Sequence, residues 1–177
     1  KNSYVIEVAS NDGYLLKNFI QLDIPCLGIE PTKGTAQAST KLGIDVIEEF
    51  FTEKMANNLV NNGKKADLII GNNVYAHVPQ INDFTKGLKK LLKDDGTITL
   101  EFAYLLTLMD NNEFDTIYHE HFSYLSLHAV KSCFSRCGLK IYDVEQLKSH
   151  GGSLRVYGCH ENSDIKISEN VKKQLLK

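Results

Sequence analysis

Short apolar runs alternate along the chain with longer segments in which apolar residues recur every three or four positions. The short runs are typical of buried strands, and the periodic segments are typical of helices with one apolar face. The helix that follows Pro79 is expected to end near residues 94–96, where two aspartates and a glycine indicate a turn. We expect strands over residues 4–9, 26–29, 45–47, 66–71, 97–102, 139–144 and 153–158. We expect helices over residues 14–20, 35–42, 53–60, 81–92, 130–137 and 168–177.

This alternation of strands and helices predicts an α/β protein, a three-layer α/β/α sandwich of Rossmann-like architecture with a mostly parallel sheet. The last two strands are joined by a connection too short for a helical crossover, so they are expected to pair antiparallel. The chain that leads from the fifth strand to the helix over residues 130–137 is expected to be a loop. Ligands of such sheets bind outside the carboxyl ends of the strands, where we therefore expect the site.

Two features near those strand ends are typical of nucleoside binding. Residues 10–13 (Ser-Asn-Asp-Gly) form a tight turn after the first strand, and Glu30 ends the second strand, seventeen residues beyond Gly13. A turn offers backbone N–H groups to an anion, and a carboxylate accepts hydrogen bonds from ribose hydroxyls. The turn lacks the glycines that a dinucleotide needs, which favours a smaller nucleoside such as S-adenosylmethionine. Alternatively, Glu30 is an acid at a strand end and the pair Asn72-Asn73 is a turn.

A dense polar stretch over residues 114–122 contains Tyr118, His119, Glu120 and His121. Histidine titrates near neutral pH, so one imidazole could act as a general base, held by the carboxylate and helped by the phenol. A solvated surface loop is an equally weighted alternative. A metal pair built on His119 and His121 is a weaker one, because no third and fourth ligand follow at a supporting spacing.

Composition narrows the class of protein. The chain has 177 residues, 42% of them apolar, and a formal net charge of -2, which gives no electrostatic case for nucleic acid or an anionic membrane as partner. Apolar runs of membrane-spanning length and a signal peptide are both missing, so a cytoplasmic location is expected. Cys133 and Cys137 lie in a helical pattern and Cys26 and Cys159 in strand-like runs, so reduced thiols are expected. Because the chain begins at Lys1, directly before a strand, it is expected to be a piece of a longer protein.

Several segments together resemble one known family, the class I S-adenosylmethionine-dependent C-methyltransferases that act on nucleotide-linked keto-deoxysugars. The most specific of them is the run Asp-Thr-Ile-Tyr-His-Glu-His-Phe-Ser-Tyr over residues 115–124. The resemblance extends over nearly the whole chain, to about Gly158. Its segments are residues 7–14, 28–31, 49–51, 72–79, 114–127 and 150–157.

The resemblance implies S-adenosylmethionine as cofactor and assigns residues to each of its parts. The segment from Glu7 to Gly13 would hold the methionine part, and Glu30 would bind the ribose. Phenylalanines would lie near the adenine, and two asparagines would form the opposite wall. The implied cofactor residues are Glu7, Ala9, Asn11, Gly13, Glu30, Pro31, Phe50, Phe51, Asn72 and Asn73.

The resemblance also implies the catalytic residues. His121 would be the base that removes a proton next to the ketone, with Glu120 orienting it and Tyr118 serving the enolate oxygen. His119 would be structural. No metal is implied within this chain.

Members of the family carry an amino-terminal cysteine-rich zinc lobe and a carboxyl-terminal lobe, and this sequence contains neither. Residues 1–160 are therefore expected to form the methyltransferase domain, with residues 161–177 as a terminal helix or linker toward the missing lobe. Zinc is expected only in the amino-terminal lobe. Other readings are an O- or N-methyltransferase of the same fold, a non-catalytic domain that binds S-adenosylmethionine, and, least favoured, a hydride-transfer enzyme.

Overall fold

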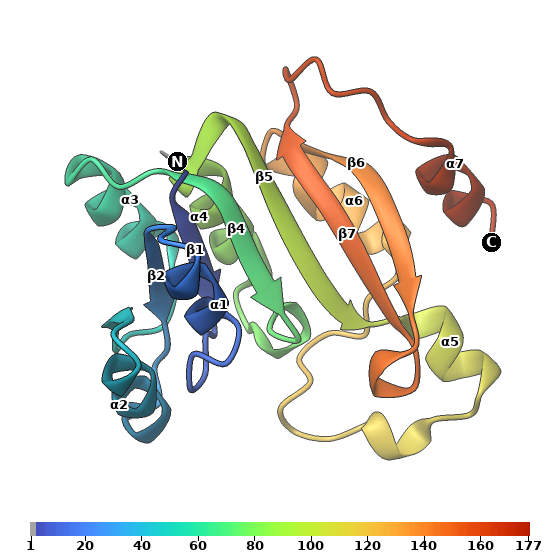
Figure 1. Cartoon of the computed structure of the whole chain (residues 1–177). Coiled ribbons are helices and arrows are strands. Elements are labelled where there is room, and N and C mark those ends of the chain that lie inside the picture. The colour runs from blue at the N-terminus through green and yellow to red at the C-terminus, as the bar shows by residue number, and fades with distance from the viewer. Residues whose placement is uncertain (1–2) are drawn as a thin grey trace.

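The computed structural model describes residues 3–177 and contains one mixed seven-stranded sheet. The strand order is β3-β2-β1-β4-β5-β7-β6, and β1 to β5 are parallel. Strand β7 runs antiparallel to both β5 and β6, as the short connection between the last two strands predicts. Figure 1 shows the sheet in the order of its strands. The strands are β1 (Val5–Val8), β2 (Cys26–Ile29), β3 (Asp45–Ile47), β4 (Ala66–Asn72), β5 (Leu92–Ala103), β6 (Leu139–Leu147) and β7 (Ser153–His160).

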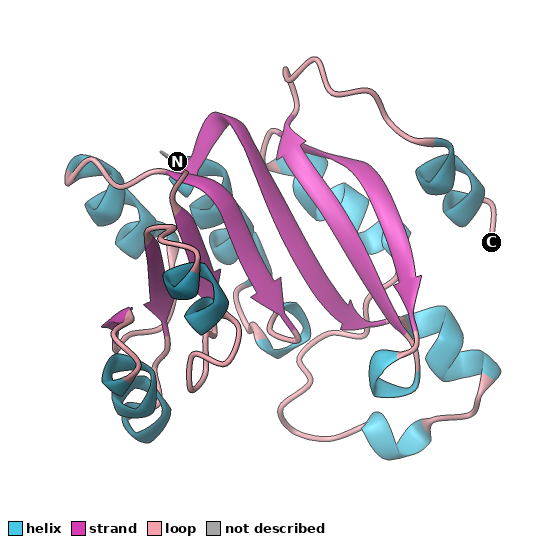
Figure 2. Ribbon diagram, viewed as in Figure 1, coloured by secondary structure: helices cyan, strands magenta, loops and turns pink. Residues whose placement is uncertain are grey.

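Helices cover both faces of the sheet, which confirms the three-layer α/β/α prediction (Figure 2). Helices α3, α4 and α6 pack on one face and supply the larger apolar core, while α1 and α2 lie on the other face near β1, β2 and β3. Helix α7 packs on β6 through the buried Val171. The helices are α1 (Leu16–Gln21), α2 (Lys33–Lys41), α3 (Glu53–Asn61), α4 (Ile81–Leu91), α5 (Leu105–Asp110), α6 (Leu127–Arg136) and α7 (Glu169–Leu175).

The helix expected to end near residues 94–96 ends three residues earlier, at Leu91, and the assigned span of β5 includes residues 94–96. Helix α4 ends at Leu91, and β5 begins at Leu92, which pairs with Ala66. The pairing then shifts register before it resumes at Leu68, so the two aspartates occupy an irregular stretch of strand. A glycine is needed at position 96, because a Cβ there would lie only 3.0 Å from the Ala66 carbonyl oxygen, closer than ordinary van der Waals contact. The Asp-Asp-Gly composition fits this irregular stretch, in which the chain turns from α4 into the regular part of β5.

The segment between β5 and α6 is more ordered than the expected loop. It contains α5 and the short 3-10 helix η2 (Phe114–Thr116). The buried Leu108 packs α5 onto the domain, and the Phe122 N–H donates to the Ala76 carbonyl oxygen at 2.9 Å. The polar stretch is thereby fixed beside the carboxyl end of β4.

All four cysteines are free thiols, as expected. Cys26 and Cys159 are buried, and Cys133 and Cys137 are half-buried. Within residues 3–177, no helix combines the length and the apolar character that crossing a membrane requires.

Candidate active site

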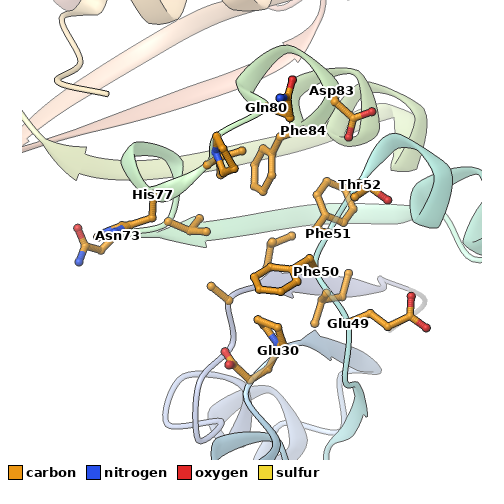
Figure 3. A pocket seen from close by; sticks show the side chains of 17 residues that line it. Glu30, Glu49, Phe50, Phe51, Thr52, Asn73, His77, Gln80, Asp83 and Phe84 are labelled. Carbon is orange, nitrogen blue, oxygen red and sulfur yellow. The ribbon is translucent and has the colours of Figure 1, made fainter. Parts of the chain in front are cut away.

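A cavity of about 530 Å³ lies at the carboxyl ends of β1, β2 and β4, the edge of the sheet at which the site was expected. This volume is within the range of small-molecule sites. Figure 3 shows Glu30 on one side of the cavity, Gln80 and Asp83 on the other, and the Phe50 ring between them. The lining includes Ala9, Glu30, Pro31, Phe50, Phe51 and Asn73 from the sequence prediction, together with Val8, Ile29, Glu49, Thr52, Val74, His77, Val78, Pro79, Gln80, Asp83 and Phe84.

Glu30 is fixed at the floor of this cavity by two backbone donors. Its Oε2 accepts from the Asn11 N–H at 3.0 Å, and its Oε1 accepts from the Thr32 N–H at 2.8 Å. Each carboxylate oxygen has more than one lone pair, so both can still accept from a ligand. Glu30 is 7% exposed, and a vicinal pair of ribose hydroxyls matches such a held, acceptor-only group. The nucleoside prediction for Glu30 therefore fits the geometry.

The cavity also has an aromatic wall. Phe51 is buried and packs edge-on against Phe84, with ring centroids 5.1 Å apart. Phe50, next to it in sequence, is 78% exposed. An exposed ring at the mouth of an apolar cavity offers a stacking surface for an aromatic ligand such as adenine. Phe51 thus builds the wall, and Phe50 is the ring available to a ligand.

Other predicted cofactor residues lie beneath the cavity or beside it. Glu7 and Gly13 are buried and are not among the lining residues. Gly13 has φ +80°, and a Cβ there would lie 2.5 Å from the Ser39 hydroxyl oxygen. A glycine at this position therefore allows the turn to pack closely against Ser39. Asn11 takes part through its backbone N–H on Glu30, and Asn72 ends β4 opposite Glu101. Their roles toward the cofactor remain predictions.

Glu7 is a buried carboxyl group without a hydrogen-bond partner at Oε2. Burial raises its pKa to about 8 from an ordinary value of 4.5. The group is therefore protonated in the folded protein at neutral pH, although it is ionised in the unfolded chain. The expected role of Glu7 toward the methionine part stays a prediction.

This pKa predicts an unusual dependence of stability on pH. Between about pH 4.5 and pH 8 the folded state binds a proton that the unfolded state has released, so the free energy of unfolding falls as pH rises. The loss from Glu7 is on the order of 1 kcal/mol per pH unit in that window. Urea unfolding of the Glu7→Gln variant should show a flatter pH profile than wild type, whereas Glu161→Gln, at an exposed position, should not. Identical slopes for Glu7→Gln and wild type would contradict the assignment.

A second cavity of about 400 Å³ adjoins the first. Asn73 lines both cavities, and its backbone is in the left-handed region, with φ 50°. Tyr118 and His121 from the polar stretch line the second cavity, so the structure brings two of the three predicted catalytic residues next to the predicted cofactor site, and Glu120 lines neither cavity. The remaining lining residues are Ala103, Glu113, Asp115, Thr116 and Gly151.

The His121 ring is held in one tautomer. Its Nδ1 lies 2.7 Å from the Thr116 carbonyl oxygen, which can only accept, so Nδ1 carries the proton. Nε2 is then the unprotonated nitrogen, as a general base requires. The Tyr118 ring lies against His121, with centroids 4.2 Å apart. The backbone of Thr116 thus orients the His121 ring, and the orienting role that the resemblance implies for Glu120, an exposed residue, stays a prediction.

His77 completes the group and was not identified from the sequence. Its ring centroid lies 4.7 Å from that of His121, and its Nδ1 lies 3.0 Å from the Glu120 carbonyl oxygen. Burial lowers the pKa of His77, and the neighbouring His121 lowers it further. His77 is forty-four positions before His121, so only the fold brings the two rings together. The one sequence signal was its place within the family-like segment 72–79.

His119 is exposed and is not a lining residue of either cavity. Among the described residues, no group of three or more histidine, cysteine or acidic side chains could hold a metal ion. His119 and His121 therefore do not face a common cavity.

Comparisons with known proteins show the family to which the chain belongs. Residues 1–144 match a family model described as a methyltransferase domain. The chain is 34% identical over 171 residues to the C-methyltransferase NovU of Streptomyces niveus. The aligned region covers 97% of this chain and 41% of NovU. The chain thus spans about two fifths of the length of this curated relative.

Solved structures share the fold at low sequence identity. Magnesium protoporphyrin IX methyltransferase (ChlM) of Synechocystis with bound SAH aligns with a TM-score of 0.68 at 13% identity, over 90% of this chain and 74% of that one. A SAM-dependent methyltransferase of Anabaena variabilis also gives 0.68 at 13% identity, over 89% and 77% of the two chains. The predicted family is confirmed, and the chain belongs to the methyltransferase domain family.

Proposed function

We propose that the complete protein methylates a carbon atom next to the ketone of a nucleotide-linked keto-deoxysugar. One observation carries the proposal: Asn73 lines both cavities, so the second cavity, which His121 lines, lies directly beside the first, which we propose for the cofactor. The name of the relative NovU, a C-methyltransferase, supports transfer to carbon. In this proposal residues 1–160 are the methyltransferase domain, and residues 161–177 lead toward a further lobe.

The first cavity fits S-adenosylmethionine. Glu30 would accept hydrogen bonds from the ribose, Phe50 would stack on the adenine, and the turn around Asn11 would face the methionine part. When bound, the cofactor supplies an electrophilic methyl group. The left-handed backbone of Asn73 would form the wall between cofactor and acceptor.

The second cavity would generate the nucleophile. A carbon next to a ketone becomes nucleophilic when it loses a proton, and His121 Nε2 would take that proton while the electron pair delocalises onto the ketone oxygen. The imidazolium that forms keeps its Nδ1–H on the Thr116 carbonyl, which stabilises the added charge. Tyr118 would donate a hydrogen bond to the enolate oxygen, and Glu120 would stabilise the cation from nearby.

His77 would assist by remaining neutral. Its lowered pKa keeps a second positive charge away from His121, which must itself become positive during the reaction. The backbone carbonyl of Glu120 holds the ring in place at 3.0 Å. Neutral His77, which lines the first cavity, would thus add an uncharged polar group beside His121.

The product identifies the reaction. The complete protein, given S-adenosylmethionine and a thymidine diphosphate-linked 4-keto-6-deoxyhexose, should form a product with one added methyl group bonded to ring carbon, as seen by carbon–proton correlation NMR. Heat-inactivated protein is the control. A methyl group on oxygen or nitrogen would assign the chain to a different acceptor class, and cofactor binding without any product would indicate a non-catalytic domain.

A further inference from the structure

The turn between β6 and β7 closes one side of the second cavity, although the proposed reaction gives it no role. It contains the 3-10 helix η3 (Ser149–Gly151) and ends at Gly152. Gly151 lines the cavity with φ +73°, and a Cβ on it would lie 2.5 Å from the Glu113 carboxylate. Gly152 has φ +136°, and a Cβ there would collide with Thr107. The two glycines therefore let the turn press closely against the segment that carries Glu113.

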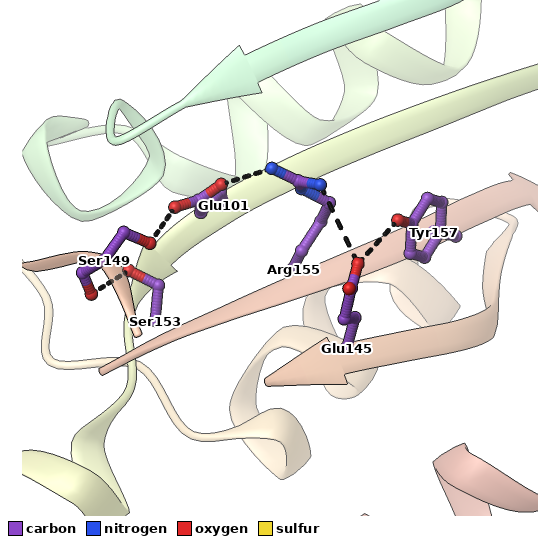
Figure 4. Close-up of polar contacts among 6 residues, drawn as sticks. All are labelled: Glu101, Glu145, Ser149, Ser153, Arg155 and Tyr157. Atoms are coloured by element: carbon purple, nitrogen blue, oxygen red, sulfur yellow. Dashed lines mark hydrogen bonds and ion pairs between the residues drawn. The ribbon is translucent and has the colours of Figure 1, made fainter. Parts of the chain in front are cut away.

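Partly buried polar contacts anchor this turn to the sheet (Figure 4). Ser149 Oγ donates to Glu101 Oε1 at 2.7 Å, and Arg155 Nη2 donates to Glu101 Oε2 at 2.8 Å. Ser153 Oγ donates to the Ser149 carbonyl oxygen at 3.1 Å. The two bonds to Glu101 are charge-assisted and therefore stronger than neutral hydrogen bonds, and Glu101 itself is buried, with 8% exposure. The turn is thus a fixed wall of the cavity.

Glu113 is held against that wall. Its Oε1 accepts from Asn111 Nδ2 at 2.8 Å, and its backbone carbonyl oxygen accepts from Thr116 Oγ1 at 2.7 Å. Thr116 is the residue whose carbonyl orients His121. A carboxylate with spare lone pairs is therefore presented to the same cavity as the base, in a fixed relation to it.

The charges of the cavity restrict what this carboxylate can bind. Its charged lining residues are Glu113 and Asp115, and no lysine or arginine is among the described residues that line it. Such a surface disfavours phosphate and favours a group that donates hydrogen bonds. The two common donors on a sugar ring are hydroxyl and ammonium.

We propose that Glu113 determines specificity by accepting a hydrogen bond from a donor substituent on the sugar ring near the reacting carbon. The fixed turn at residues 149–152 keeps the carboxylate at the distance from His121 that this recognition requires. This inference rests on the proposed function, since it assumes that the second cavity receives the sugar.

The test uses the complete protein, two variants at one position and two sugar probes. The probes are the thymidine diphosphate-linked 4-keto-6-deoxyhexose with hydroxyl substituents and its 3-amino-3-deoxy analogue. Glu113→Ala should lower kcat/KM for the preferred probe by about 10- to 100-fold, mainly through KM, because a charge-assisted hydrogen bond is lost. The affinity for S-adenosylhomocysteine and the thermal midpoint should stay close to wild type.

Glu113→Gln distinguishes the two donors. A glutamine oxygen still accepts from a hydroxyl, so if the sugar presents a hydroxyl to Glu113, kcat/KM should fall about threefold or less. If the sugar presents an ammonium group, kcat/KM should fall nearly as much as in Glu113→Ala, because glutamine lacks the negative charge of the carboxylate. Glu161→Gln is the matched control, since Glu161 is exposed and follows β7 at the opposite end of the sheet.

Three results would overturn the inference. Wild-type kcat/KM in Glu113→Ala with both probes would exclude Glu113 and leave the proposed function intact. A parallel loss of cofactor affinity in that variant would give Glu113 a structural role only. Absence of methyl transfer by the wild type with both probes would overturn the proposed function itself and this inference with it.

Discussion

Replacing His121 with asparagine should lower turnover of the complete protein by ~10²–10⁴ and leave cofactor affinity nearly unchanged. Asparagine has an N–H donor that can replace Nδ1–H on the Thr116 carbonyl, so the segment should keep its conformation. It has no nitrogen that can take a proton at neutral pH. The loss would therefore report the missing base.

Exchange of solvent deuterium gives an independent measurement of the same step. With S-adenosylhomocysteine bound, wild type should introduce deuterium from solvent into the carbon beside the ketone, because proton removal does not need the methyl group. His121→Asn should not, and His128→Asn, at an exposed position on α6, should behave like wild type. Exchange by His121→Asn at the wild-type rate would place the base elsewhere, with Glu120 or His119 as the next residues to replace.

Loss of the Glu30 carboxylate should weaken binding of S-adenosylhomocysteine by at least tenfold and toward a hundredfold. The ribose would lose charge-assisted hydrogen bonds worth about 1.5–3 kcal/mol, and the N–H groups of Asn11 and Thr32 would lose their acceptor. Isothermal titration calorimetry of Glu30→Ala and Glu30→Gln measures this directly. Glutamine should be intermediate, since only one of its two terminal atoms can accept.

Glu161→Ala serves as the control for the calorimetry, because its exposed carboxylate is remote from both cavities. If Glu30→Ala bound the cofactor with wild-type affinity, the ribose assignment would be wrong. If it failed to fold, as judged by circular dichroism, Glu30→Gln would carry the comparison alone.

The fold could be predicted from the sequence because its strands and helices have distinct hydrophobic periods. Buried runs such as residues 66–71 and the glutamate after the second strand were sufficient to place the ligand site at one sheet edge. The start of β5 at Leu92 could not be predicted, because the Asp-Asp-Gly stretch that follows has the composition of a turn and the pairing of Leu92 with Ala66 is a tertiary contact. Helix α5 was likewise not predicted and lies within the segment that was expected to be a loop.

Some residues of the site could likewise be predicted from the sequence, and others depend on tertiary contacts. Glu30, Phe50 and Asn73 could be identified because strand ends and family-like segments mark them in the sequence. The contact between Thr116 and His121 was not predictable, because a backbone carbonyl acts there and carries no side-chain signature. His77 joins the site only through packing of one loop on another.

The backbone around the first cavity is set before any ligand arrives. Ala9 and Asn11 have φ values of 57° and 54°, in the left-handed region, as does Asn73 at 50°. Asparagine tolerates this conformation, but alanine is strained in it by about 1–2 kcal/mol. The folded chain bears that strain continuously, so association with the cofactor does not have to impose it. Preorganisation of this kind converts part of the stability of the free domain into affinity, and a stabilised variant that relaxed Ala9 would bind from a less ordered starting state.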